Sequence, residues 1–316
     1  MTKLFCFSIL FVVTIFAAGL FSGCKIFTPA TKKDTIAESR NLRQEGILLL
    51  ERGEIQNAEK KLSEAVELNK KDAEIKRSWA ESLWKLGKKQ EAVAQLTESL
   101  VLTGNNDVKT LLSLSEKCYE LGDYEIAFDC AEKAINATKS DWAAAEENRA
   151  LISRAWVIRA RVKRNQNEIQ QAFADYHKAI SLDPKNAGLL SELAVLQTAN
   201  HQPERALATW HSVGRLYPPE QEPPQVVFGC GDAYMAMQQY PLACDQYEIA
   251  NRRWPENINS YCRLAEAKLA CGMIHEAAII AQRAFELAPN HQECLAVRNH
   301  VESVIAQQLQ GQGLIR

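Results

Sequence analysis

The amino-acid sequence predicts an all-α protein built from repeated pairs of helices. Gly and Pro are scarce, with 14 and 10 among 316 residues, or about 8 % together against roughly 12 % in average proteins. Residues that favour helices, such as Ala, Leu, Glu, Gln and Lys, are abundant. An alanine also recurs at intervals near 34 residues, at Ala58, Ala92, Ala127, Ala172, Ala206, Ala243 and Ala277.

The recurring alanine belongs to a longer pattern that predicts two helices per copy. A small residue usually follows it seven positions later, at Ala65, Ser99, Ala134, Ala179, Val213, Ala250 and Ala284. Residues that mark a turn precede it by five positions, at Gly53, Gly87, Gly122, Asn167, His201, Gln238 and Gly272. The last four copies then end in a proline, which cannot continue a helix, at Pro184, Pro218, Pro255 and Pro289.

This pattern resembles the tetratricopeptide repeat, a helix–turn–helix unit of 34 residues. In that family position 8 is small, and here it is Gly46, Ala80, Ser115, Ala160, Ala194, Gly231 and Ala265. Position 24 is aromatic or apolar, and here it is Leu62, Leu96, Ala131, Tyr176, Trp210, Tyr247 and Ala281. The resemblance implies an α-α superhelix of about seven units, at residues 39–72, 73–106, 108–141, 153–186, 187–220, 224–257 and 258–291. Each unit buries its apolar face only against its neighbours, so the length of the chain measures the number of repeats.

Two segments depart from the period. Eleven extra residues follow Asp141, and Trp142–Arg164 contains no Gly or Pro, which predicts one long first helix in the fourth unit. Strict spacing then places Arg159 and Lys163 at positions that are normally buried. Four prolines in Tyr217–Pro224 predict a stiff joint between the fifth and sixth units.

After the last repeat we expect a capping helix over residues 292–309 and a frayed tail over 310–316. The capping helix is expected to present one face that contains Leu295, His300, Val304 and Gln308.

The first 23 residues have the features of a secretory signal peptide. One Lys precedes the apolar stretch Leu4–Phe21, and small residues precede Cys24. Leu20-Phe21-Ser22-Gly23-Cys24 resembles a bacterial lipobox, in which the Cys thiol is acylated, with Phe21 where Leu is usual. Residues 24–38 are expected to form a flexible tether. An uncleaved signal anchor is the alternative, because about 18 apolar residues can just span a bilayer.

Either alternative places the rest of the chain outside the cytoplasm. Lys25 follows the lipobox Cys, at a position where inner-membrane lipoproteins of well-studied diderm bacteria commonly have Asp. The resemblance therefore implies a lipid-anchored protein of the bacterial cell envelope, at the outer membrane and facing the periplasm.

The sequence predicts no catalytic, cofactor or metal site. It contains no His-Glu-x-x-His, no Gly-x-Ser-x-Gly and no phosphate loop. Cys271, His275, His291 and Cys294 have zinc-like ligand types, but the fold should separate the first two from the last two by about 20 Å. The net charge of −2 gives no field to attract nucleic acid.

Seven cysteines follow Cys24, an odd number that cannot all pair with one another. Repeat spacing places Cys118 and Cys230 at core positions, where Cys acts as a small hydrophobic residue. Cys244 and Cys271 should lie near the same end of adjacent helices, so a disulfide between them is possible. Packed, reduced thiols are the prediction for most of the seven.

In the resembling family the concave groove binds partners through the first helix of each unit. Arg154, Arg161 and Arg164 would face this groove from the fourth unit, where guanidinium groups can bind carboxylates of a partner. The alternative is a solvated basic face that pairs with Glu146, Glu147 and Glu168. The candidate apolar anchors for an extended peptide or a helix are Trp84, Tyr119, Phe228 and Met235, although any of them can belong to the core.

We therefore expect a non-catalytic scaffold or adaptor that binds protein partners in its groove and is tethered to the membrane by lipid on Cys24. Its expected role is to assemble or organise an envelope complex, without a cofactor or nucleic acid. The alternatives are an envelope protein that binds glycans or small molecules, and an accessory subunit of a cell-wall enzyme. An enzyme would need a further domain, and no stretch of about 80 residues lies outside the repeats.

Overall fold

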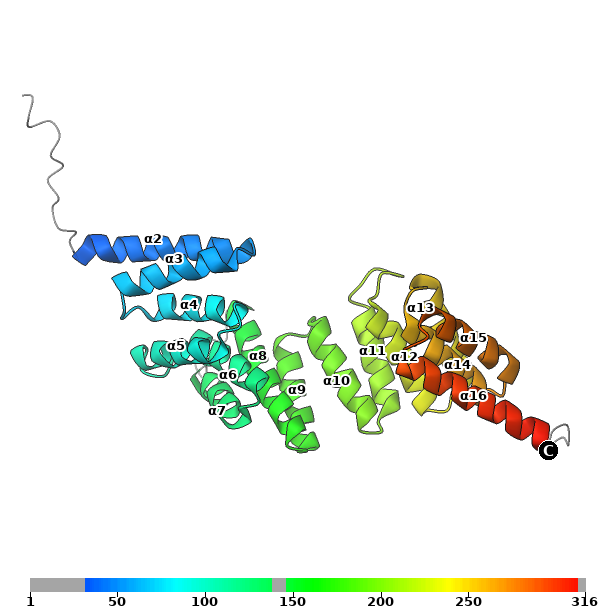
Figure 1. Ribbon diagram of the computed structural model, residues 1–316. Coiled ribbons are helices and arrows are strands. Elements are labelled where there is room, and N and C mark those ends of the chain that lie inside the picture. The colour runs from blue at the N-terminus through cyan, green and yellow to red at the C-terminus, as the bar shows by residue number, and fades with distance from the viewer. Residues whose placement is uncertain (1–31, 138–145, 312–316) are drawn as a thin grey trace, which may run out of the picture. The chain divides into compact units, whose positions relative to one another are not determined.

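The structure of the protein is a computed structural model that describes residues 32–137 and 146–311, which form α-helices and no strand. These helices fall into two compact units, divided after Gly104. The first unit contains α2 (Lys32–Glu51), α3 (Ile55–Leu68), α4 (Ala73–Lys85) and α5 (Lys89–Leu102). The predicted all-α class is confirmed (Figure 1).

The second unit contains the remaining described helices. They are α6 (Val108–Leu121), α7 (Tyr124–Ala137), α8 (Glu146–Asn165), α9 (Ile169–Leu182), α10 (Ala187–Ala199), α11 (Pro203–Gly214), α12 (Pro224–Ala236), α13 (Tyr240–Arg253), α14 (Ile258–Ala270), α15 (Ile274–Leu287) and α16 (Gln292–Gly311).

Helices that follow one another in the chain pack as pairs. In the first unit α2 packs on α3 and α4 on α5, and in the second unit the pairs run from α6–α7 to α14–α15. The final helix, α16, packs against α14 and α15 (Figure 1). Seven helix pairs and a last helix are the arrangement that the repeat predicts.

Small side chains lie where two helices of a pair approach most closely. The alanines that define the repeat, from Ala58 to Ala277, are all completely buried. The residues at position 24 are also buried, including the large rings of Tyr176 and Tyr247. Where position 8 is Ser115, its hydroxyl donates a hydrogen bond to the carbonyl oxygen of Ala127 at 2.6 Å. The predicted register is therefore confirmed, because only small residues allow this contact between helices.

The turn inside each pair is made by a residue in the left-handed conformation. All seven residues expected there have a positive φ, between 55° and 87°, at Gly53, Gly87, Gly122, Asn167, His201, Gln238 and Gly272. Glycine adopts this conformation without strain, whereas a residue with a Cβ atom pays about 1 kcal/mol or more. The turns at His201 and Gln238 are therefore strained by their sequence, whereas Asn167 tolerates this conformation.

Replacing Gln238 with glycine should stabilise the protein. Gln238 has φ of 59°, so Gln238→Gly relieves its strain and should raise the free energy of unfolding by about 0.5–1 kcal/mol. Urea unfolding followed by circular dichroism measures the change. The matched control is Gln239→Gly, because Gln239 has φ of −87° and gains nothing from glycine. Equal effects of the two substitutions would contradict the prediction.

The long fourth unit keeps the repeat register despite its basic residues. Ala160, the small residue of this unit, is completely buried, as are Ala155 and Val162. Consequently Arg159 and Lys163 lie at largely buried positions, with side chains 20 % and 17 % exposed. Asp141 and Trp142, the predicted start of this helix, lie outside the described residues.

The two ends of the repeat array differ from expectation. Helix α2 already begins at Lys32, so the last part of the expected tether is helical, because its Lys, Asp, Ala and Glu residues all tolerate a helix once Pro29 is passed. The expected face of α16 is wrong: His300 and Gln308 are exposed. Its buried face contains Cys294, Val297 and Val301, with Ile305 packed beside them.

Among the helices that the structure describes, none is long and apolar enough to cross a membrane. The apolar stretch Leu4–Phe21 and the candidate lipid attachment residue Cys24 lie outside the described residues, as do residues 312–316 of the expected frayed tail.

Candidate functional site

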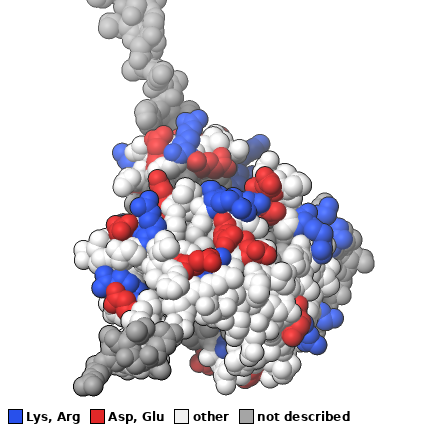
Figure 2. Space-filling view, turned by 90° about the vertical axis from the view of Figure 1, so that its right-hand side faces the viewer, with Lys and Arg blue, Asp and Glu red and all other residues white. Residues whose placement is uncertain are grey.

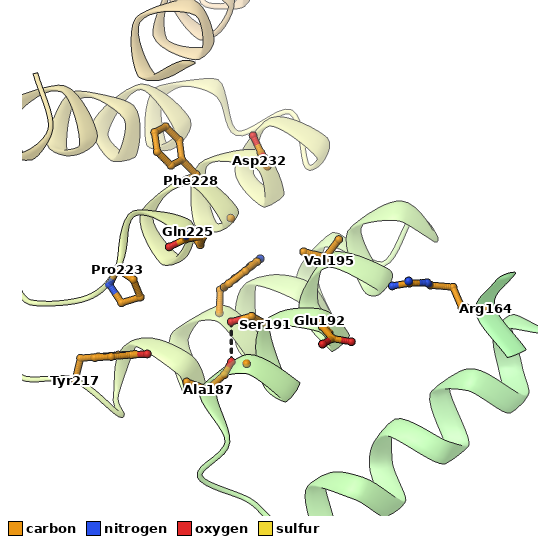
Figure 3. A pocket seen from close by; sticks show the side chains of 13 residues that line it. Arg164, Ala187, Ser191, Glu192, Val195, Tyr217, Pro223, Gln225, Phe228 and Asp232 are labelled. Carbon is orange, nitrogen blue, oxygen red and sulfur yellow. Dashed lines mark hydrogen bonds between the residues drawn. The ribbon is translucent and has the colours of Figure 1, made fainter. Parts of the chain in front are cut away.

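A groove of about 650 Å³ lies in the second unit between α10 and α12. Small and exposed side chains of α10 form one wall, and aromatic and acidic side chains of α12 form the other (Figure 3). Arg164, from the end of α8, reaches into one end of it (Figure 3). The residues that matter most for its chemistry are Arg164, Gly188, Ser191, Val195, Phe228 and Asp232.

Residues without bulk create this space. Ala187, Gly188 and Ser191 line the groove from α10, and these positions gave no functional signal in the sequence because small residues carry little chemistry. Opposite them, Gly229 lies against the ring of Trp210, and a Cβ atom there would lie 2.1 Å from Trp210 Cε2. The glycine thus allows the buried Trp210 ring to form the floor.

The proline-rich joint closes one end of the groove. Tyr217 and Pro223 of this segment line it beside the start of α12 (Figure 3). The joint is tied to α13, because the carboxylate of Glu222 accepts a hydrogen bond from Arg253 at 2.7 Å. A segment predicted only as a stiff connection therefore contributes to the site.

The groove offers two apolar contacts of different kinds. Val195 is 56 % exposed and lines the groove from α10. Phe228 is partly buried, and its ring centre lies 6.4 Å from that of Tyr247 in the core. Phe228 is therefore held in place from behind while it lines the groove.

Arg164 is the groove's cationic group. Its guanidinium Nη2 lies 3.5 Å from the hydroxyl oxygen of Tyr119, and among the described residues no carboxylate lies within ion-pair distance of it. The neighbouring Arg161 is already engaged, because its guanidinium donates two hydrogen bonds to Glu192. Of these two arginines, Arg164 is therefore the one that can bind a carboxylate of another molecule without breaking an ion pair inside the protein.

Glu192 lines the groove as a satisfied carboxylate. Its Oε2 also accepts a hydrogen bond from the hydroxyl of Tyr176 at 3.1 Å. Burial raises the pKa of Glu192, but the hydrogen bonds and charge of Arg161, the hydroxyl of Tyr176 and the charge of Arg164 outweigh it, so the pKa stays below its usual value. Glu192 is therefore ionised at neutral pH and partly offsets the arginines near it.

Three further basic side chains of α8 are paired inside the protein. Arg154 donates to Glu116 of α6 at 2.6 Å, and Arg159 binds both oxygens of Asp175 on α9 at 2.7 and 2.8 Å. Lys163 pairs with Glu168 at 2.6 Å. Of the predicted partners only Glu168 is observed, and the side chains of Glu146 and Glu147 lie outside the described residues. Most carboxylates come from other helices, which spacing along α8 cannot reveal.

The structure separates the predicted site residues. Arg164 and Phe228 line the groove, whereas Arg154 and Arg161 are engaged in ion pairs and Tyr119 contacts Arg164.

The remaining two predicted anchors lie elsewhere. Met235 packs beside the core cluster that contains Tyr247. Trp84 belongs to the first unit, half-buried, with the ammonium group of Lys89 5.2 Å from its ring centre.

On one face of the molecule (Figure 2), acidic and basic side chains are mixed rather than gathered by sign. Figure 2 shows acidic and basic side chains beside one another on the face that it displays, next to a broad area with neither. In the described part of the chain, no three His, Cys, Asp or Glu side chains are grouped as metal ligands.

Comparison with known proteins identifies the repeat. Residues 153–186 and 258–291 each match the tetratricopeptide repeat family, and no curated protein matches the sequence. A solved tetratricopeptide repeat protein from Parabacteroides merdae superimposes with a TM-score of 0.57 at 16 % identity, covering 84 % of this chain and 99 % of that one.

Two further solved structures share the fold. The C-terminal part of a repeat-containing protein from Cytophaga hutchinsonii has a TM-score of 0.59 at 17 % identity, covering 74 % of this chain and 88 % of that one. PilW, a type IV pilus biogenesis factor, has a TM-score of 0.60 at 13 % identity, covering 69 % and 94 %.

The described helices thus form a helical-repeat fold. Two of its repeats, residues 153–186 and 258–291, match the tetratricopeptide repeat family, and solved tetratricopeptide repeat proteins share the fold.

Proposed function

We propose that the chain is a non-catalytic scaffold of the bacterial cell envelope, anchored by lipid on Cys24, that holds a segment of a partner protein in the groove between α10 and α12. The single observation that carries this proposal is the groove itself, in which the exposed Val195 and the ring of Phe228 lie near an arginine without an ion-pair partner. This combination suits a peptide segment with an apolar side chain followed or preceded by a carboxylate.

The envelope location is supported by the signal-like N-terminus, the lipobox resemblance at Cys24 and Lys25 after it. PilW shares the fold and is a type IV pilus biogenesis factor. We propose a comparable kind of role for this chain, in assembling or organising an envelope complex at the outer membrane, facing the periplasm.

Capture of partners from detergent-solubilised envelopes tests the proposal. The full chain should retain a protein in stoichiometric amount, and Val195→Glu should weaken this retention at least tenfold, because it places a charge in the apolar groove beside Arg164. Ile279→Glu is the matched control, since Ile279 is a 70 % exposed apolar residue on α15 that does not line the groove. Circular dichroism confirms that both variants fold.

The outcomes separate the proposal from its alternatives. Equal loss of the partner in both variants would refute the groove as the binding site. Retention of envelope glycans without any protein would favour the glycan-binding alternative. Release of the chain from membranes by Cys24→Ala supports the lipid anchor, and unchanged membrane retention counts against it.

A further inference from the structure

Four of the seven described cysteines lie in two close pairs near the C-terminus. Sγ of Cys244 on α13 lies 3.8 Å from Sγ of Cys271, the residue that caps α14. Sγ of Cys262 on α14 lies 3.3 Å from Sγ of Cys294 on α16. Both pairs therefore involve α14, once toward the preceding helix and once toward the last one.

The other three described cysteines provide a contrast within the same chain. Cys118, Cys130 and Cys230 are buried thiols. Burial and, to a smaller extent, nearby Cys118 raise the pKa of Cys130. In the described part of the chain, the two C-terminal pairs are the ones whose sulfurs are in hydrogen-bond contact. A disulfide has an S–S distance of about 2.05 Å, so the sulfurs must approach by about 1.8 Å in Cys244–Cys271 and by about 1.3 Å in Cys262–Cys294.

We propose that Cys244 with Cys271, and Cys262 with Cys294, form two disulfide bonds that fasten α14 to α13 and to α16. The sequence suggested the first pair but not the second, because Cys294 lies beyond the repeats whose spacing could place it. The partners are 27 and 32 residues apart, and cross-links across loops of this length restrict the unfolded chain considerably.

The chemistry requires a disulfide oxidant such as oxidised glutathione. One protein thiolate attacks a sulfur of the oxidant and releases one reduced glutathione; the second thiolate attacks the mixed disulfide and releases another. Two protein thiols are oxidised, one glutathione disulfide is reduced, and the two thiol protons end on the released glutathione. His291 Nδ1 lies 3.7 Å from Sγ of Cys294, so its imidazole can accept the proton of that thiol.

The two pairs should differ in rate. Cys271 is partly exposed and gives an oxidant access to the first pair, whereas Cys262 and Cys294 are completely buried. Burial raises the pKa of Cys244 to about 12, so its thiolate is scarce at neutral pH and exchange is slow. The second pair must wait for α16 to open, or form as α16 docks during folding. In the cell, a disulfide oxidant would be met outside the cytoplasm, where the chain is proposed above to lie. The distances between the paired sulfurs do not depend on that location.

Mapping of disulfides by mass spectrometry tests the proposal without any substitution. The full chain in detergent is incubated with excess oxidised glutathione just below its melting temperature, then denatured, alkylated and digested. We expect linked peptides for Cys244–Cys271 and Cys262–Cys294, alkylation of Cys118, Cys130 and Cys230, and a melting temperature roughly 5–10 °C above that of the reduced chain. Alkylation of all seven cysteines, or linkages between other partners, would overturn the proposal. If only one of the two linkages is found, the proposal is overturned for the pair that remains alkylated.

Two variants confirm the assignment. Cys271→Ser should leave Cys244 alkylated while the Cys262–Cys294 linkage persists. Cys230→Ser is the matched control, because it removes a buried thiol without a sulfur neighbour and should leave both linkages. Because the oxidant is supplied in the tube, the result does not depend on partner binding or on the envelope location.

Discussion

Asp175→Ala should destabilise the protein by roughly 3 kcal/mol, because it leaves the guanidinium of Arg159 without its main partner inside the protein. The side chain of Asp175 is only 7 % exposed and that of Arg159 only 20 %. Both carboxylate oxygens of Asp175 accept hydrogen bonds from Arg159. These hydrogen bonds also raise the pKa of Arg159. After the substitution only Glu132, at 3.9 Å, and the ring of Trp156 remain beside the charge.

Two controls show whether burial causes the loss. Asp129→Ala removes a carboxylate from Lys133 on α7, where both side chains are more than half exposed, and should cost less than about 1 kcal/mol. The double variant Arg159→Met with Asp175→Leu removes both charges and should recover most of the stability. Urea unfolding of the four proteins supplies the comparison. If Asp175→Ala lowers the free energy of unfolding no more than Asp129→Ala does, the Arg159–Asp175 pair does not stabilise the fold.

Tyr247→Ala should cost about 4 kcal/mol, since it empties the space of a completely buried ring. Tyr247→Phe keeps the ring but removes the hydroxyl that donates to Asp232 at 2.6 Å, and should cost about 2 kcal/mol because Asp232 loses a hydrogen bond. Burial and the nearby carboxylate hold the pKa of Tyr247 well above its usual value, so the hydroxyl stays a donor at any physiological pH. Thermal and urea unfolding measure both changes.

Gly231 provides the test of whether this packing is specific. A Cβ atom at Gly231 would lie 2.5 Å from the Tyr247 ring, so Gly231→Ala in the natural chain should overpack the core and destabilise it by about 1–3 kcal/mol. In the Tyr247→Ala background the ring is gone, and the same substitution should be neutral or stabilising, since Ala favours a helix over Gly. The same cost in both backgrounds would contradict the packing described here.

Much of the fold could be predicted because the repeat imposes a physical constraint on each unit. The small residues at positions 8 and 20 are required wherever two helices approach, and all of them are buried. The turn residues were equally predictable, since a chain that reverses in so few residues needs a positive φ, and even His201 and Gln238 adopt it. Two features were not predicted: the buried face of α16, which follows no repeat and is selected by packing on α14 and α15, and the start of α2 at Lys32.

The candidate site was predicted only in part. Arg164 and Phe228 were identified from their places in the repeat, but the same reasoning gave equal weight to Arg154 and Arg161, whose partners Glu116 and Glu192 lie on other helices. The small residues of α10 gave no signal, although Gly188 and Ser191 create the space that a ligand would occupy.

The sequence by itself therefore determined the helices, their pairing, the register of the buried positions and the turns, because these depend on local conformation and on a spacing of about 34 residues. The tertiary structure alone decided which of Arg154, Arg161 and Arg164 remains without a carboxylate, where the groove opens, and that Cys262 meets Cys294. Such features arise where side chains from different helices meet, and the distance between them is set by packing in three dimensions rather than by spacing along the chain.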